Sequence, residues 1–351
     1  LAIDSGAYTG SSGQYGSPHC KNYYWRTIAH NSLLIHDPAE NFGRDYGNDG
    51  GQRLPNGRSE PKHLDALRDP KNGYRTGEVL AQGMGPDPGR PEFTWLKGDI
   101  TAAYGPKAGA VIRSFAFLDL GDPALPAALI VFDRVVAKDP AFKKCWLLHC
   151  IEEPHIEGST AIVDRAGPGG GGRLHVSALL PEANNLALGK VGGPGKAFWV
   201  FGENWPNDPP PGAAEKSSIE PGAWRVEISP ERAAAEDLFL TVMQATSTGG
   251  GAIAPVTRVD AGGWVGCRIA APSGDRIVLF RRDGAASAET AAFDVPPGKG
   301  ARVLVGDLTP GRWSATRTGA AGIKALEVAA PAMAAHFKAA PGKWTLARNF
   351  P

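Results

Sequence analysis

The stretch PAALIVFDRVVAKDPAFKKCWLLH, from Pro126 to His149, contains two apolar runs separated by a short polar segment. The runs, Ala127 to Ala137 and Cys145 to Ile151, are rich in branched and aromatic side chains, which are favoured on the half-buried surface of a strand. The segment between them carries Asp and Pro, two residues typical of turns. The stretch therefore predicts two β-strands.

Similar runs recur along the whole chain. Long amphipathic helical patterns are nearly absent, whereas 46 Gly and 30 Pro residues supply frequent turns. Short strands divided by turns favour stacked antiparallel sheets over alternating strands and helices, so the predicted fold class is all-β. The other runs are Asn31 to His36, Ala110 to Asp119, Ala197 to Phe201, Trp224 to Ile228, Leu238 to Gln244, Arg276 to Arg281, Arg302 to Val305 and Arg312 to Thr316.

The chain of 351 residues is long enough for two structural units. A turn-rich segment APSGD, Ala271 to Asp275, follows the strand VGCRIAA and opens a new set of strands. We therefore expect a large antiparallel β-sandwich over residues 1–270 and a smaller β-domain over 271–351. The polar segment from Asn41 to Pro91, crowded with Gly, Pro, Asn and Asp, is expected to form surface loops near a cleft.

The charge balance is nearly neutral, with 37 Lys and Arg residues against 36 Asp and Glu residues. Such a balance gives no general field that attracts polyanions, so an acidic substrate would need a local cluster of cations. It also argues against nucleic acid as a partner, because no concentrated basic run appears. No apolar run approaches the roughly 18 residues that span a membrane. The four widely spaced cysteines are expected to be buried free thiols.

The first 38 residues, LAIDSGAYTGSSGQYGSPHCKNYYWRTIAHNSLLIHDP, gather many ionisable and aromatic side chains. Asp4 lies in an apolar strand, where a buried carboxylate requires a partner, either a backbone donor of the following turn or a metal ion. His30 precedes the apolar strand NSLLI, where it is either a hydrogen-bonded core residue or a ligand. From the residues alone both interpretations stay open, because a zinc site needs three or four ligands and only two candidates are visible.

Several segments can be compared with a known family as an ordered set. They are LAIDSGAY and YYWRTIAHNSLLIHDP near the start, NDGGQR (Asn48 to Arg53), TGEVLAQGMGPDP (Thr76 to Pro88), WLKGDITAAY (Trp95 to Tyr104), the opening stretch quoted above, KAFWVFGENWPNDP (Lys196 to Pro209) and AWRVEISP (Ala223 to Pro230). In this order they resemble heparinase II and its relatives in the heparinase II/III group of polysaccharide lyases. The resemblance covers roughly residues 1–245 and is thin beyond them. We therefore expect this chain to be the carboxyl-terminal portion of such an enzyme.

In these relatives an amino-terminal helical toroid leans on a central β-sandwich, a smaller β-domain follows, and the cleft lies between toroid and sandwich. The resemblance also implies a zinc ion held by a His of an HxH-type segment, the Asp of the IDSG strand and the His of TIAHN. Asp4 and His30 resemble the second and third of these ligands, and the first would precede this chain. Such a zinc ion would be structural, joining two segments that shape the cleft.

The activity that the resemblance implies is β-elimination at a 4-linked uronic acid. The carbon-5 proton becomes acidic enough only when the neighbouring carboxylate is neutralised, and a Tyr or His then acts as base. Tyr8 and Tyr15 resemble cleft tyrosines of the family and are the catalytic candidates, with strand-edge packing as the alternative. The principal acid and base groups of the relatives have no counterpart here, so we expect this chain alone to be inactive.

Three further residues are candidates for binding the substrate. Arg53, together with Lys21, would supply local positive charge for a sulfated uronide, unless it is a solvated loop charge. Asn31 would contact the substrate carboxylate or orient His30, and a role in strand pairing or capping fits equally well. His19 is expected at a loop surface or behind residues that touch the substrate.

The function expected from the resemblance is cleavage of heparin or heparan sulfate, with alginate or another uronate polymer as the alternative substrate. Two other classes stay open: a non-catalytic β-sandwich that binds polysaccharide, and an epimerase that inverts carbon 5 without elimination. The expected partners are an acidic polysaccharide and the amino-terminal toroid, and a homodimer is compatible with the sequence. The resemblance implies a periplasmic or secreted protein.

Overall fold

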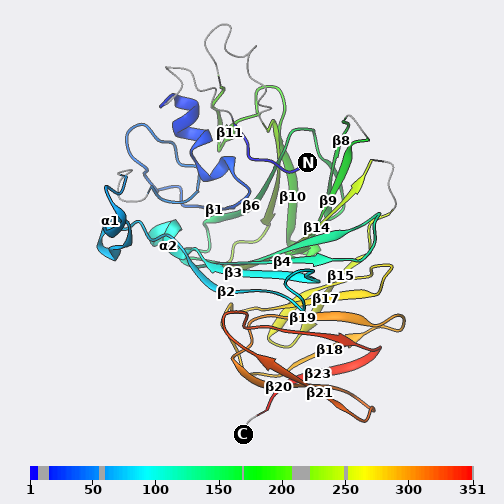
Figure 1. Ribbon diagram of the computed structural model, residues 1–351. Coiled ribbons are helices and arrows are strands. Elements are labelled where there is room, and N and C mark those ends of the chain that lie inside the picture. The colour runs from blue at the N-terminus through cyan, green and yellow to red at the C-terminus, as the bar shows by residue number, and fades with distance from the viewer. Residues whose placement is uncertain (7–15, 55–59, 168–169, 208–221, 249–251, 350–351) are drawn as a thin grey trace.

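The computed structural model describes residues 1–351 apart from 7–15, 55–59, 168–169, 208–221, 249–251 and 350–351. Its strands form four main sheets stacked in layers, and the amino-terminal segment covers the outer face of the first layer (Figure 1). Three apolar cores separate the four sheets, and a fourth lies under the amino-terminal segment. The predicted all-β fold of stacked antiparallel sheets is confirmed.

The first sheet has four strands and lies beneath the amino-terminal segment. One of its faces packs on the second sheet, and the other packs on the amino-terminal segment. In spatial order its strands are β1 (Leu33–His36), β6 (Lys143–Cys150), β13 (Trp224–Pro230) and β10 (Leu186–Gly192).

The second sheet is the largest, with eight strands, and contributes to a core on each of its faces. In spatial order its strands are β2 (Glu78–Gly85), β3 (Phe93–Asp99), β4 (Ala108–Asp119), β5 (Ala127–Ala137), β14 (Glu236–Ser247), β9 (Gly172–Leu180), β8 (Thr160–Arg165) and β7 (His155–Glu157).

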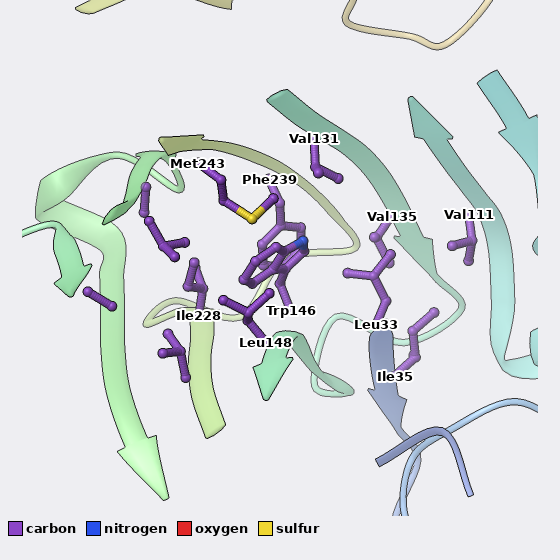
Figure 2. Packing of buried hydrophobic residues seen from close by; sticks show 14 of the residues in the cluster. Leu33, Ile35, Val111, Val131, Val135, Trp146, Leu148, Ile228, Phe239 and Met243 are labelled. Atoms are coloured by element: carbon purple, nitrogen blue, oxygen red, sulfur yellow. The ribbon is translucent and has the colours of Figure 1, made fainter. Parts of the chain in front are cut away.

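β5 and β6, the two predicted strands of the opening stretch, lie in facing sheets. Val131 and Val135 of β5 and Trp146 and Leu148 of β6 belong to one apolar core between the first and second sheets (Figure 2). Full burial of one such aliphatic side chain contributes about 1.5–3 kcal/mol. The short connection between the two runs therefore crosses from one layer to the next, and the apolar core holds the layers together.

The third and fourth sheets form a smaller sandwich at the carboxyl-terminal end of the stack (Figure 1). The pair β17 and β19 is parallel, and the other pairs of these sheets are antiparallel. The third sheet has β15 (Val256–Ala261), β16 (Trp264–Ile269), β17 (Asp275–Arg281), β19 (Ala301–Val305) and β22 (Ala335–Ala339), and the fourth has β18 (Ala291–Val295), β23 (Gly342–Arg348), β20 (Gly311–Arg317) and β21 (Ile323–Val328).

This smaller unit begins before the expected boundary near residue 270. β15 and β16 form an antiparallel pair, and β16 pairs in turn with β17, so the third sheet starts at Val256. The turn APSGD, which suggests a boundary in the sequence, is only the connection between β16 and β17. The boundary is therefore displaced toward the amino terminus, because a turn between two paired strands has the same composition as a turn between domains.

The smaller sandwich packs directly on the second sheet. Phe132 of β5 stacks on Phe280 of β17 with 5.2 Å between ring centroids. Lys97 of β3 forms a buried ion pair with Asp307, and each of these side chains is 3% exposed. Apolar and charged contacts thus join the two units across one shared core.

Short helices and a two-stranded ribbon complete the described structure. The segment from Asn41 to Pro91 contains β2 and short helices, so the prediction of loops alone is wrong there. β2 is an edge strand with mostly exposed side chains, which explains why it lacks a strong apolar pattern. The elements are η1 (Cys20–Tyr24), η2 (Thr27–Ala29), α1 (Leu64–Arg68), η4 (Pro70–Asn72), α2 (Thr101–Tyr104), η5 (Gly105–Lys107), η6 (Ala183–Asn185), β11 (Trp199–Val200) and β12 (Glu203–Asn204).

The four cysteines, Cys20, Cys145, Cys150 and Cys267, are free and buried, as predicted. Cys145 faces the amino-terminal segment and Cys150 faces the second sheet, because residues an odd number apart in a strand point to opposite faces. Burial raises the pKa of Cys145, Cys150 and Cys267 to about 12, which keeps these three thiols protonated. Across the described parts of the chain, no helix has the length and apolar character needed to cross a membrane.

Candidate functional site

Asp4 and His30 are brought together by the backbone hydrogen bonds around them. The amide of Ile3 donates to a carbonyl of β6 at 3.1 Å, and the amide of Ser5 donates to the carbonyl of Ala29 at 2.9 Å. His30 follows η2 directly in an extended conformation. The segment around Asp4 therefore runs between β6 and η2, which places its carboxylate beside the imidazole.

The carboxylate and the imidazole face each other at short range. Nδ1 of His30 lies 3.3 Å from Oδ1 of Asp4, and the two side chains are 44% and 67% exposed. Two ligands of a tetrahedral zinc ion, each at about 2.0–2.1 Å from the metal, lie about 3.4 Å apart. The pair therefore has the donor types and the separation that a shared zinc ion requires, and its exposure leaves room for further ligands.

A third side-chain ligand is absent from the described residues. Among them, no group of three His, Cys, Asp or Glu side chains is placed to hold a metal ion. Asp4 and His30 can supply half of a four-ligand site, and the zinc ion stays a prediction. Without a metal the two groups form an exposed ion pair only when His30 is protonated, and such a pair contributes little to stability.

Asn31 joins the segment of Asp4 to β6 through its side chain. Its Oδ1 accepts a hydrogen bond from the amide of His149 at 2.7 Å, and its Nδ2 donates to the carbonyl of Ile3 at 3.2 Å. Its own carbonyl accepts a hydrogen bond from Arg113 at 3.1 Å. Both ends of the side chain are engaged with backbone, so the strand-linking role is present and the expected contact with substrate stays a prediction.

Arg113 of β4 is a residue that the sequence does not single out. Its guanidinium binds Asp133 of β5 through Nε to Oδ1 at 2.6 Å and through Nη2 to Oδ2 at 3.1 Å. Both residues are buried, and the same arginine borders a hollow of about 310 Å³ over β3 and β4. Because it also reaches the carbonyl of Asn31, this ion pair connects the second sheet to the strands around His30.

His19 lies in the interior, which excludes the loop surface and leaves the other expected position, behind residues that touch the substrate. The residue is 2% exposed, and its ring stacks on Tyr23 with 5.7 Å between centroids and meets the edge of Phe198 at 4.8 Å. Nδ1 of His19 lies 2.7 Å from the carbonyl oxygen of Trp205. The partners near residue 200 are distant in the sequence, which explains why local composition does not reveal this burial. A role in binding substrate stays a prediction.

Arg26 and Asp49 form a buried ion pair that anchors the loop after β1. Oδ1 of Asp49 accepts from Nε of Arg26 at 3.1 Å and from Nη2 at 2.5 Å, and Oδ2 accepts from the amide of Ile28 at 3.1 Å. The guanidinium also lies 3.9 Å from the ring centroid of Phe42. Arg26 therefore positions the segment that leads to His30, and its burial keeps it away from a substrate.

Arg53 links α2 to the residue that follows η4 through its guanidinium. Nε donates to the carbonyl of Ala102 at 2.8 Å, and Nη2 donates to the carbonyl of Gly73 at 2.6 Å. Lys21, which is expected to act with it, pairs with Asp45 at 3.3 Å. No described carboxylate forms an ion pair with Arg53, and its expected role in binding an acidic substrate stays a prediction.

The two catalytic candidates, Tyr8 and Tyr15, lie outside the described residues. Tyr23 is a described tyrosine of the same amino-terminal segment, and its hydroxyl lies 2.8 Å from Oγ of Ser5. The same Oγ donates to the carbonyl of Gly222 at 2.5 Å. Burial raises the pKa of Tyr23. This tyrosine is therefore a structural hydroxyl and is poorly suited to act as a base.

His149 of β6 is buried close to the pair formed by Asp4 and His30, and its carbonyl accepts the hydrogen bond from the amide of Ile3. Its strand neighbour in register is Arg225 of β13. Burial, together with the charges of Arg225 and His30, lowers the pKa of His149 to about 3 and outweighs the effect of the Ile28 backbone. Within the described residues its ring nitrogens make no hydrogen bond of normal geometry. His149 is therefore a neutral ring packed behind the exposed pair.

The carboxyl-terminal sandwich matches a known family. The family model of the heparinase II C-terminal domain matches residues 258–348, a range that runs from β15 to the end of β23. This segment is similar to the heparinase II C-terminal domain. For residues 258–348 the expected heparinase-like character is thereby confirmed, although these residues lie beyond residue 245, where the resemblance of the sequence is thin.

Two solved heparinase structures are also similar to this chain at low sequence identity. A heparinase III shares 11% identity over 80% of this chain and 34% of its own length, with a TM-score of 0.46. A mutant of the heparan sulfate lyase HepC from Pedobacter heparinus shares 12% identity over 64% of this chain and 33% of its own length, with a TM-score of 0.38. The match thus spans about a third of the length of either structure. No curated protein matches this sequence.

Proposed function

We propose that this chain is part of a polysaccharide lyase that cleaves heparin or heparan sulfate by β-elimination. The observation that carries the proposal is the match of residues 258–348 to the heparinase II C-terminal domain. A second support is the contact between Asp4 and His30 at 3.3 Å, in a different part of the molecule. The complete activity is proposed for a longer protein that includes this chain.

The proposed reaction breaks the bond between carbon 4 of a uronic acid and its glycosidic oxygen. A base removes the carbon-5 proton while the neighbouring carboxylate is neutralised, and an acid protonates the departing oxygen. The product carries a double bond between carbons 4 and 5, so the electrons of the lost C–H bond remain in the sugar. In this proposal Tyr8 and Tyr15 act at the cleft together with acid and base groups from outside this chain.

Asp4 and His30 would hold a zinc ion together with a ligand from outside this chain. The zinc ion would join the segment around Asp4 to η2 and so stabilise one wall of the cleft. Arg53 and Asn31 are proposed to bind the acidic sugar, and His19 would support the same wall from the interior. Both metal ligands must be deprotonated to bind zinc, so acid releases the metal.

The proposal includes an amino-terminal helical toroid as the partner of the β-sheets, a periplasmic or secreted location, and assembly as a homodimer. Large apolar side chains exposed on three adjacent strands support a further contact surface, because such groups favour burial against a partner. Those side chains are Val79, Leu80 and Met84 of β2, Leu96 of β3 and Phe117 of β4. Fractionation of the natural host and the mass of the native assembly test the location and the homodimer.

The activity test uses the chain joined to the residues that precede it in its natural protein. Heparin, heparan sulfate and alginate are supplied in parallel, and the ultraviolet absorbance of the unsaturated uronate is followed. We expect absorbance with heparin or heparan sulfate. Absorbance with alginate alone would move the proposal to another uronate polymer, and an inverted sugar without absorbance would indicate an epimerase.

Tight binding without any product would favour a non-catalytic polysaccharide-binding protein. The joined protein with Tyr8→Phe or Tyr15→Phe completes the test, because loss of turnover with unchanged folding would place that tyrosine at the cleft. Unchanged turnover would return it to a packing role.

The zinc ion is tested by elemental analysis of the joined protein and of its His30→Ala and Asp4→Asn variants. We expect each variant to lose zinc and thermal stability together. His155→Ala is the matched control, because His155 also forms an exposed contact with a carboxylate, at 3.0 Å from Glu157. Zinc retained in both variants, or absent from the parent protein, would remove the metal from the proposal.

A further inference from the structure

A basic cavity of about 700 Å³ lies at one end of the carboxyl-terminal sandwich. The topology brings together the first residues of β17, β19, β21 and β23 and the last residues of β20 and β22. The apolar cores place this sandwich at the opposite end of the stack from the amino-terminal segment (Figure 1). The lining contains one carboxylate, Asp275, and six cations, which are Arg276, Lys299, Arg302, Arg317, Lys324 and Lys338.

Three of these cations lie side by side on adjacent strands. Arg276 of β17 is in register with Arg302 of β19, and Arg302 is in register with Lys338 of β22. In-register neighbours point to the same face of a sheet, and like charges placed directly opposite each other destabilise the pair of strands. Of the three cations, only Arg302 forms an ion pair with a described carboxylate, that of Glu92 at 3.0 Å, so the other two charges of the row favour an anion that binds beside them.

The carboxylates near the row do not balance the cavity. Asp275 is paired with Arg268 at 2.5 Å, and Glu92 is paired with Arg302 at 3.0 Å. Arg276 is 3% exposed, and its guanidinium donates only to neutral acceptors, including the carbonyl of Asp119 at 2.9 Å. The charges of Asp119, Glu92 and Asp275 partly offset that of Arg276, but no described carboxylate forms an ion pair with it. A buried, orientated guanidinium of this kind is a feature of a prepared anion site.

The remaining cations are also without carboxylate partners in the described structure. Lys299 donates to the carbonyl of Pro272 at 2.6 Å, and Arg317 donates to the carbonyl of Pro341 at 3.1 Å. Lys324 and Lys338 are exposed, and neither forms an ion pair with any described residue. The local excess of positive charge contrasts with a net charge of +1 for the whole chain.

The charges of three of these cations also affect the pKa of His336 in β22. Burial lowers its pKa, the carboxylate of Glu92 opposes this, and the charges of Arg302, Arg276 and Lys338 lower the pKa further. Three cations therefore act together on a single imidazole.

We propose that this cavity binds an acidic polysaccharide through its sulfate or carboxylate groups, as a second binding site separate from the Asp4 and His30 pair. The choice of polysaccharide rests on the proposed function. A single sugar chain fits a localised cavity, whereas a nucleic acid duplex requires a broad basic face that this nearly neutral chain lacks. Two sites on one polymer raise the affinity of the whole enzyme, because the second contact is intramolecular.

The test is calorimetric titration of heparin oligosaccharide into the 351-residue chain at several salt concentrations. The variant Lys324→Ala/Lys338→Ala removes two exposed charges without touching the core. We expect about a three- to tenfold loss of affinity and a salt dependence that is weaker by about one unit of slope for each lysine. The control is Lys138→Ala/Lys143→Ala, which removes two exposed lysines of the β5 to β6 connection.

Unchanged affinity in the cavity variant, or an equal loss in the control variant, would overturn the proposal. Competition with inorganic sulfate and with a short DNA duplex identifies the occupant, and equal or tighter binding of DNA would also overturn it. The measurement needs no turnover, so it is independent of the lyase assay. A joined protein that cleaves nothing would refute the proposed function, while loss of heparin binding by the lysine variant would still establish the cavity.

Discussion

Residues 16–53 and the carboxyl-terminal sandwich differ in what lies at their centre, a buried ion pair in the first and an apolar core in the second. In the first region Arg26 and Asp49 are paired at 1% and 0% exposure, and Lys107 of η5 pairs with Glu40. In the second region the core between the two sheets is apolar and contains three tryptophans. Charged pairs depend on individual partners, whereas an apolar core depends on total packing.

Because of this difference, we expect the two regions to respond differently to substitutions of buried residues. The first region contains one short strand, β1, and two short helices, so much of it is held by side-chain contacts with its neighbours. Loss of one such contact is expected to open that region locally. The carboxyl-terminal sandwich is a network of paired strands around one core, and loss of packing there is expected to lower the stability of the whole unit.

The largest expected effect comes from Trp313→Ala in the carboxyl-terminal core. Trp313 is fully buried, and its Nε1 donates to the carbonyl of Thr309 at 2.9 Å. Removing the indole leaves a large cavity and an unpaired carbonyl, at a cost of about 4 kcal/mol. Urea unfolding measures this loss. Trp199→Ala, at a partly exposed tryptophan, is the control and should cost much less.

Equal losses in these two variants would contradict the assignment of the carboxyl-terminal core as a cooperative unit. Hydrogen exchange sharpens the test, because amides of β16, β17 and β20 should lose protection together in Trp313→Ala. Protection of amides near His30 should change little, since the two cores that intervene remain intact.

A somewhat smaller effect is expected for Asp49→Asn in the amino-terminal region. The substitution keeps the shape of the side chain but leaves the buried guanidinium of Arg26 without a counter-charge, at a cost of about 3 kcal/mol. Hydrogen exchange should show local opening of residues 26–53. The double variant Arg26→Leu/Asp49→Leu should recover part of the loss, because no charge remains buried. Global unfolding with no local step would argue against the contrast between the regions.

The variant Gly51→Ala tests the packing of the same loop without changing its charge. A Cβ atom at Gly51 would lie 2.4 Å from Oδ2 of Asp49 and 2.4 Å from Cβ of Thr27. Relief of such contacts requires displacement of the buried pair, at a cost of about 2 kcal/mol. Gly189→Ala is the matched control, because nothing lies within 4 Å of its added Cβ. Similar thermal stabilities of the two variants would show that the loop yields easily.

The sequence predicts strands correctly where apolar residues alternate with polar ones or form a long continuous run. The run Ala127 to Ala137 coincides with β5, and Ala110 to Asp119 differs from β4 only at its start. β2 escapes the same reasoning, since an edge strand with exposed apolar and polar residues has no clear period. The sequence also fails to predict that β15 and β16 belong to the third sheet, because the residues of a strand do not show which strand it pairs with.

The candidate site likewise contains residues that the sequence predicts and residues that it does not. The family resemblance singles out Asp4 and His30, and the structure places their side chains 3.3 Å apart. The burial of His19 and the ion pair between Arg113 and Asp133 depend on contacts between distant segments, so no local pattern predicts them. Sequence reasoning thus finds groups that lie together in a short segment and misses the interior residues that hold them.

The smallest expected effect is the change in stability of the carboxyl-terminal sandwich with pH, through His336 beside the basic cavity. Because the pKa of His336 is lowered from its ordinary value of 6.5, the unfolded chain binds a proton more readily than the folded protein. The contribution of His336 to stability is therefore complete above pH 6.5 and is lost as the pH falls below that value. Stability of the carboxyl-terminal sandwich should decrease in this direction.

Lys338→Ala tests the cause of this pKa shift. Removal of one of the three cations that act on His336 should raise its pKa toward the ordinary value, and it should weaken the loss of stability in acid. Binding of a heparin oligosaccharide should shift the pKa in the same direction, because its anionic groups offset the same charges. NMR titration of the imidazole measures both changes, with Lys143→Ala as the control. A pKa that moves with neither change would mean that burial alone sets it, and the electrostatic link between His336 and the cavity would be lost.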